Sequence, residues 1–90
     1  MIEVRAIHAL GAGEARRRIE TLAREQGVAC SWNEDGVATI ERAVPFLGRA
    51  RADVEVGASE VVVRVLEAPS AFGEATLRRW IGDALAQVLA

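Results

Sequence analysis

Three residues of this 90-residue chain are of types that often do chemistry, but their spacing matches no common catalytic or metal-binding motif. His8 is the only histidine, and together with Glu14 it could act as a general base. A surface or loop-capping imidazole is the simpler interpretation. Cys30 is the only cysteine, so no intrachain disulfide can form, and on a buried strand face it would pack as a small hydrophobic residue. We therefore predict no enzymatic activity, no metal and no cofactor.

All eleven basic residues are arginine, and the densest run is Arg16–Arg18. This run could bind a phosphate or an acidic partner. A helix, however, spreads three consecutive residues over about 200°, so a solvated helix face is the simpler interpretation. Gly11 and Gly13 form only a fragment of a phosphate-binding loop. Because the net charge is −2, we expect no nucleic-acid partner.

The elements that would position these residues follow from hydrophobic periodicity. Alternation of apolar and polar residues predicts about five strands, and helical spacing predicts two helices. The predicted strands cover 2–6, 28–33, 37–42, 49–56 and 61–66, and the predicted helices cover 12–26 and a segment that begins at Ser70 or Gly73. This order, β-α-β-β-β-β-α, predicts one α+β domain over residues 1–90: an antiparallel sheet with two helices packed on one face.

The register of the hairpin around Gly36 can be argued from its loop length. A two-residue loop, Asp35-Gly36, would pair Trp32 with Thr39. A three-residue loop, Glu34–Gly36, pairs Trp32 with Ala38 and gives Gly36 the left-handed position that favours glycine. We prefer the second choice because only this register places Cys30, Trp32, Ala38 and Ile40 on one face.

Two connections are less determined. Pro45 interrupts the pattern over 44–48, which we interpret as a bend or loop. The first strand must join the sheet at an edge, beside either the last strand or the second one.

The last predicted helix carries a broad apolar stripe made of Leu77, Trp80, Ile81, Ala84, Leu85, Val88 and Leu89. The stripe could coat a lipid or polymer surface, but covering the sheet is the simpler account. We expect Trp32 and Trp80 to be core residues. An open cavity lined by Trp32, Ile40 and Trp80 would favour a carrier of apolar ligands, whereas a packed core would favour an accessory protein.

Self-association is expected through the outer face or an edge of the sheet. Val62 and Leu66 form an apolar pair on the nominally outer face of the last strand, and an unpaired sheet edge is a further liability. A two-fold homodimer would bury both. The alternative is a monomer in which the stems of Arg51 and Arg64 lie across this pair.

Localisation follows by default. No apolar run approaches the roughly 20 residues of a membrane span, and the N-terminus lacks the features of a signal peptide. We therefore expect a cytoplasmic protein without a transmembrane segment.

A set of spaced residues suggests a family. They are His8 and Leu10 before a helix with Glu14-Ala15-Arg16 and Ile19-Glu20, then Trp32 before an acidic-glycine turn, and Gly48 before a valine-rich strand pair. From Ile2 to about Leu89 the chain resembles the polyhydroxyalkanoic acid system family, small bacterial proteins also called granule-region proteins. It departs from the family pattern at Ala29 and at Val44–Leu47, which is bulkier than expected.

The resemblance implies a short antiparallel sheet gripped by helices, and it supplies no catalytic residues. It looks like a reduced version of larger helix-grip domains, which hold apolar ligands between a sheet and a C-terminal helix. The leading expectation is a non-enzymatic accessory or binding protein linked to polyhydroxyalkanoate storage, with a polyester granule or granule protein as partner. The alternative is a carrier of small apolar ligands.

Overall fold

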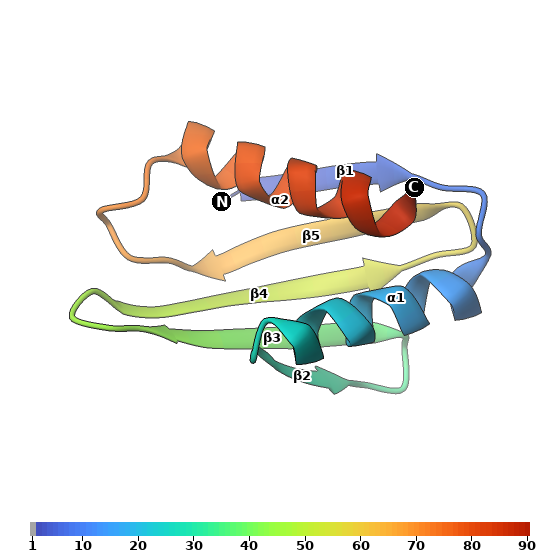
Figure 1. The fold of residues 1–90 in the computed structure, drawn as a ribbon, viewed down its shortest axis with the longest axis horizontal. Coiled ribbons are helices and arrows are strands. Elements are labelled where there is room, and N and C mark those ends of the chain that lie inside the picture. The colour runs from blue at the N-terminus through green and yellow to red at the C-terminus, as the bar shows by residue number, and fades with distance from the viewer. Residues whose placement is uncertain (1) are drawn as a thin grey trace.

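Five antiparallel strands and two helices make up the computed structural model, which describes residues 2–90 (Figure 1). The elements are β1 (Ile2–Ile7), α1 (Ala12–Glu25), β2 (Ala29–Trp32), β3 (Val37–Val44), β4 (Gly48–Val56), β5 (Glu60–Glu67) and α2 (Glu74–Leu89). The predicted α+β architecture and element order are confirmed.

The strands lie in the order β1-β5-β4-β3-β2. The first strand therefore pairs with the last strand, one of the two positions open to it. Val4 of β1 lies opposite Val63 of β5, and Ala6 lies opposite Val61. Apolar residues of the two strands therefore contact one another on the side that faces the helices. The other strand that β1 could have joined, β2, has only four residues and could form fewer backbone hydrogen bonds with β1 than β5 does.

The β2–β3 hairpin has the predicted three-residue loop and register. Trp32 lies opposite Ala38, and the Asn33 backbone N–H donates to the Val37 carbonyl at 2.9 Å. Gly36 has φ 77°, the left-handed conformation that glycine adopts without steric cost. The Asn33 side-chain oxygen accepts from the backbone N–H of Asp35 and of Val37, which holds the turn.

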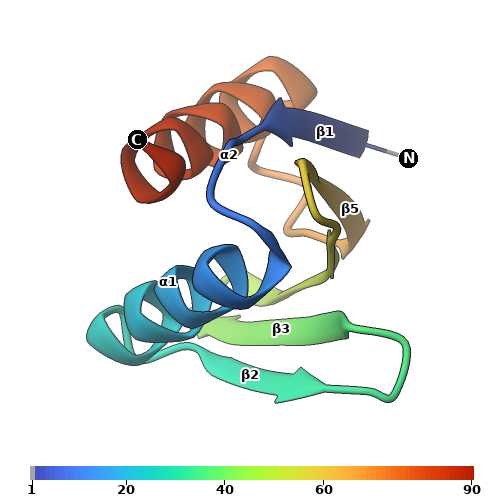
Figure 2. The same ribbon diagram turned by 90° about the vertical axis from the view of Figure 1, so that its right-hand side faces the viewer.

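The helices run in opposite directions across the concave side of a sheet that curls around them (Figures 1 and 2). At one end they are tied together by Arg18 of α1, whose guanidinium donates to the backbone carbonyls of Val88 and Ala90 at the end of α2. On the far side of α2, Arg78 donates to the Glu3 carbonyl of β1. This contact covers part of the free edge of β1.

The core lies between the helices and the sheet. Its buried residues are Ile19 of α1, Leu85 of α2 and four strand residues, Ala38, Val54, Val61 and Val63. Four of these six residues are alanine or valine, so few large side chains fill the space between the helices and the sheet. This leaves room for the cavity described next.

Candidate functional site

An apolar cavity of about 240 Å³ opens between α1, α2 and the concave face of the sheet. Helix side chains form its walls, strand side chains form its floor, and all but one of the lining residues are apolar. The lining residues are Ile19, Leu22, Ala23, Gln26, Val28, Ile40, Ala52, Val54, Val63, Ile81, Ala84, Leu85 and Val88. Hydrocarbon walls of this kind leave polar groups unsatisfied, so the cavity suits an apolar ligand.

Small side chains explain why the cavity exists. Ala23 of α1, Ala84 of α2 and Ala52 of β4 face one another from the three sides of the space. A larger residue at any of these positions would fill it. Arg18 of α1 holds the two helices together through its hydrogen bond to the Val88 carbonyl near the end of α2. Gln26 and Val28 line the cavity just after the end of α1.

Arg42 brings a cation near this apolar space. The helix-facing positions of β3 are Ala38, Ile40, Arg42 and Val44, by strand alternation. Ile40 lines the cavity, and Arg42 lies two positions further along the same face, about 7 Å away along the strand. Arg42 is exposed and forms no ion pair with residues 2–90. Sequence reasoning missed it, although an arginine that interrupts an apolar alternation was the available signal.

Of the three predicted ligand-binding residues, only Ile40 lines the cavity. The expectation that Trp80 is a core residue is wrong, because 48% of it is exposed. Its ring packs edge-on against Phe72, with 5.4 Å between ring centroids. A helix turns about 100° per residue, so when Ile81 and Leu85 face the sheet, Trp80 is carried to the margin of the stripe.

Trp32 is half-buried and packs against the core from β2. The Arg16 guanidinium lies over its ring, 4.3 Å from the centroid. The indole N–H is buried and has no hydrogen-bond partner among residues 2–90. Trp32 is therefore a packing residue at the side of the fold and not a wall of the cavity.

Cys30, the neighbour of Trp32 on the same strand face, is partly buried. Burial raises the pKa of its thiol, and the nearby Glu20 carboxylate raises it further against the opposing effect of Arg16. A raised pKa disfavours the thiolate, which is the nucleophilic form. The environment of Cys30 thus fits the predicted role of a small hydrophobic residue.

His8 caps a loop, as one interpretation predicted, but it does so from a buried position with 7% exposure. Its Nδ1 accepts a hydrogen bond from the Leu10 backbone N–H at 3.2 Å, so the neutral ring carries its proton on Nε2 and donates to the Gly57 carbonyl at 3.1 Å. Both ring nitrogens are thereby engaged in holding backbone.

The pairing of His8 with Glu14, considered for a general base, is not formed. The Glu14 carboxylate instead accepts from Arg17 at 2.7 Å and from Arg18 at 3.1 Å. These hydrogen bonds lower the pKa of Glu14 to about 2. Arg17 and Arg18 thus share Glu14, whereas Arg16 lies near Glu20 and over the Trp32 ring, so the three arginines pair within the helix face and do not form one free basic patch.

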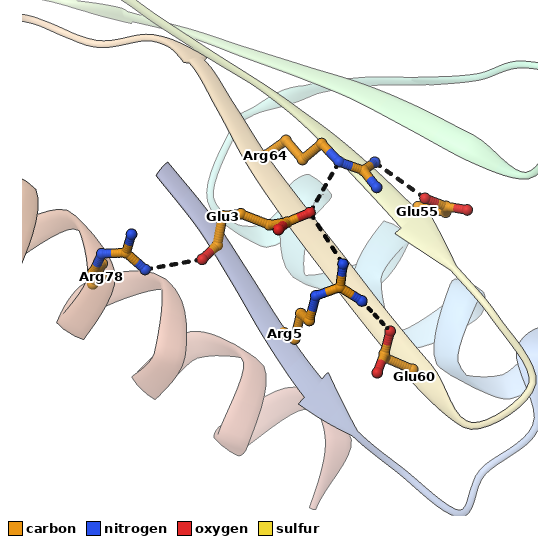
Figure 3. Close-up of polar contacts among 6 residues, drawn as sticks. All are labelled: Glu3, Arg5, Glu55, Glu60, Arg64 and Arg78. Carbon is orange, nitrogen blue, oxygen red and sulfur yellow. Dashed lines mark hydrogen bonds and ion pairs between the residues drawn. The ribbon is translucent and has the colours of Figure 1, made fainter. Parts of the chain in front are cut away.

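The outer face of the sheet carries a ladder of charges on β1, β5 and β4 (Figure 3). Arg64 pairs with Glu3 at 3.2 Å and with Glu55 at 3.1 Å, and Arg5 pairs with Glu60 at 2.9 Å. Each of these side chains is partly exposed, so solvent screens the pairs.

The charge ladder changes the predicted interface. Val62 is only 5% exposed, because it lies between Arg5 and Glu55 of the neighbouring strands. The expectation that Val62 offers an apolar contact surface is therefore wrong. Leu66 keeps 44% of its surface exposed and remains a candidate contact residue.

Residues 2–90 also bear on a metal site and on a membrane span. No group of three or more His, Cys, Asp or Glu side chains could hold a metal ion within that range. Over the same residues, neither helix has the length and apolar character needed to cross a bilayer.

Comparison with known proteins adds no relative. No family model matches the chain, and neither the curated proteins nor the solved structures contain a significant match. The resemblance to the polyhydroxyalkanoic acid system family stays a prediction, and function must be argued from the geometry.

Proposed function

We propose that this protein binds a small apolar molecule, or the apolar end of an amphipathic one, between its two helices and its sheet. The observation that carries the proposal is the open, hydrocarbon-lined cavity of about 240 Å³. An open cavity was expected to favour a carrier over a protein with a packed core, although of the three wall residues expected for it, Trp32, Ile40 and Trp80, only Ile40 lines this one.

The size of the cavity limits the ligand. An apolar protein cavity of roughly 150 Å³ accommodates benzene, so in proportion this one holds about ten carbon atoms. Sites for drug-sized ligands are larger, at about 300–1,000 Å³. A medium-length acyl chain or a single substituted aromatic ring fits the available space.

Arg42 favours an anionic end group on that ligand. It lies on the same strand face as Ile40, and none of its charge is neutralised by an ion pair with residues 2–90. A carboxylate at the rim would form a charge-assisted hydrogen bond with the guanidinium. Octanoate, with its tail in the cavity and its carboxylate at Arg42, is the simplest probe.

Titration of octanoate, followed by NMR or calorimetry, tests the proposal. Ala84→Leu places a larger side chain in the cavity and should weaken binding by about tenfold or more. Ala86→Leu is the matched control, because Ala86 lies on the exposed side of the same helix. Ala52→Val fills the cavity from the sheet, in case the helix variant unfolds. Unchanged octanoate binding in both folded filling variants would exclude the cavity.

A second titration tests the end group. Octylamine has the same chain but a cationic end, and should bind more weakly than octanoate. Arg42→Gln should remove that preference, whereas Arg51→Gln, on the outer face of the sheet and paired with Glu41, should keep it. A preference that survives Arg42→Gln would show that Arg42 is not the end-group partner.

Association with polyhydroxyalkanoate granules is the second candidate. What supports it, besides the resemblance, is exposed apolar surface outside the cavity, at Phe46, Leu47 and Leu66. Pull-down from cells grown with and without polyester accumulation tests it directly. Recovery of the same material under both conditions would contradict a link to polyester storage.

A further inference from the structure

The turn between β3 and β4 presents apolar side chains to solvent at the end of a hairpin. We call this turn, Val44–Gly48, the hairpin tip. Phe46 is fully exposed, and 48% of Leu47 is exposed beside it. Pro45 is exposed as well. Three consecutive exposed apolar residues on a projecting turn have no role in the core.

The backbone of the hairpin tip holds Phe46 outward at a conformational cost. The Leu47 N–H donates to the Val44 carbonyl at 3.1 Å, which closes a four-residue turn with Pro45 second and Phe46 third. Phe46 has φ 66°, as the third residue of a type II turn requires, and that position normally takes glycine or asparagine. A bulky residue in this conformation is uncommon and is typical of functional positions.

Two arginines lie beside the hairpin tip, together with one carboxylate, that of Glu67. Arg42 and Arg49 flank it on β3 and β4, and the connection from β5 to α2 reaches the same end (Figure 1). The acidic turn with Glu34 and Asp35 precedes β3, so it lies at the opposite end of that strand. Apolar and cationic groups thus share one end. Arg49 has only a long ion pair, of 3.7 Å to Glu67.

We infer that the hairpin tip inserts into the surface of an anionic phospholipid layer. A convex turn without a surrounding rim fits a deformable phase better than the concave groove of a folded partner. Hydrocarbon would receive Phe46 and Leu47, while Arg42 and Arg49 would meet the anionic headgroups. This inference requires no ligand in the cavity and extends beyond ligand binding, although Arg42 serves both proposals.

Flotation with vesicles tests the inference. The full chain should bind vesicles of equal parts phosphatidylglycerol and phosphatidylcholine, and should bind pure phosphatidylcholine weakly. Phe46→Ser should reduce the partition coefficient by about tenfold or more. Arg42→Gln and Arg49→Gln should each reduce it by about fivefold on the anionic vesicles.

Three controls separate insertion from other effects. Leu66→Ser removes another exposed apolar side chain, 44% exposed, from β5 outside the hairpin tip and should leave vesicle binding unchanged. Phe46→Gly relieves the turn, so it should raise the melting temperature while it reduces vesicle binding as Phe46→Ser does. Ala84→Leu, which fills the cavity, should bind vesicles like the parent, so the two proposals can fail separately.

Several outcomes would overturn the inference. One is a parent chain that binds neither kind of vesicle, and another is a folded Phe46→Ser variant that binds as well as the parent. Binding to polyester particles without binding to vesicles would reject the lipid layer and support the second candidate function. A concentration-dependent increase in mass that Phe46→Ser abolishes would identify a second copy of the chain as the occupant.

Discussion

The imidazole of His8 joins the end of β1 to the β4–β5 turn through its hydrogen bonds to Leu10 and Gly57. Its removal would leave a partly buried N–H and a partly buried carbonyl without partners. We therefore expect His8→Ala to reduce the free energy of unfolding by about 1–3 kcal/mol, as measured by urea denaturation. A change within about 0.5 kcal/mol, the range of ordinary surface substitutions, would contradict this role.

Trp32 gives a prediction of the opposite sign. Its buried indole N–H lacks a partner, and an unsatisfied donor of this kind costs about 1–3 kcal/mol. Trp32→Phe removes the donor and keeps a ring under the Arg16 guanidinium. We expect the thermal midpoint to stay the same or rise. Trp32→Ala loses the ring as well, so this comparison variant should melt at a lower temperature than the parent. If Trp32→Phe melts as low as Trp32→Ala, the unpaired indole N–H does not destabilise the parent.

At the scale of elements, the first turn of α1 is sensitive to acid. The pKa of Glu14 in the folded chain is about 2, below its ordinary value of 4.5, because Arg17 and Arg18 bond its carboxylate. A lowered folded pKa means that this stabilisation is complete above about pH 4.5 and is lost as the pH falls toward 2. Unfolding midpoints measured across this window should decline more steeply in the parent than in Glu14→Gln.

The arginine partners provide the control for that titration. Arg17→Gln removes the largest cause of the lowered pKa, so the folded pKa of Glu14 should lie closer to 4.5, and the decline should be smaller and end at a higher pH than in the parent. An identical pH profile for the parent and Glu14→Gln would show that the ion pairs do not contribute to stability.

Local elements were predictable from the sequence because their determinants are local. Gly36 favours one loop length, and that loop length sets the register that places Trp32 opposite Ala38. The outward position of Trp80 was not predictable, because the apolar stripe of α2 spans more residues than the sheet can cover. Which of them face the sheet depends on the tilt of the helix over β1.

The site depends on arrangements that periodicity does not encode. Ala23, Ala52 and Ala84 each read as ordinary small core residues, and only the packing of two helices and a curled sheet brings them around one space. The sequence likewise allows two partners for β1, the last strand or the second, since pairing between segments far apart in the chain has no local signal. Ile40 was correctly placed on the helix-facing side because the hairpin register determined its face.

At the scale of the whole molecule, the homodimer stays a prediction, now supported by Leu66 and the sheet edge and no longer by Val62. Val62 is covered within the chain, but Leu66 is exposed and β2 is an edge strand. Sedimentation at micromolar concentration should give more than the 9.7 kDa of a single chain, and Leu66→Glu should shift the parent toward that mass. A single species at 9.7 kDa for both proteins would rule out the dimer.

The cavity also makes the heat capacity of binding an informative variable for this fold. Burial of apolar surface on binding lowers the heat capacity. The cavity of about 240 Å³ is open, so part of its apolar lining contacts solvent until a ligand covers it. Octanoate should therefore bind the parent with a negative heat-capacity change, measured by calorimetry at several temperatures, and this change should be smaller in Ala84→Leu. A heat-capacity change near zero for the parent would show that the alkyl chain stays outside the cavity.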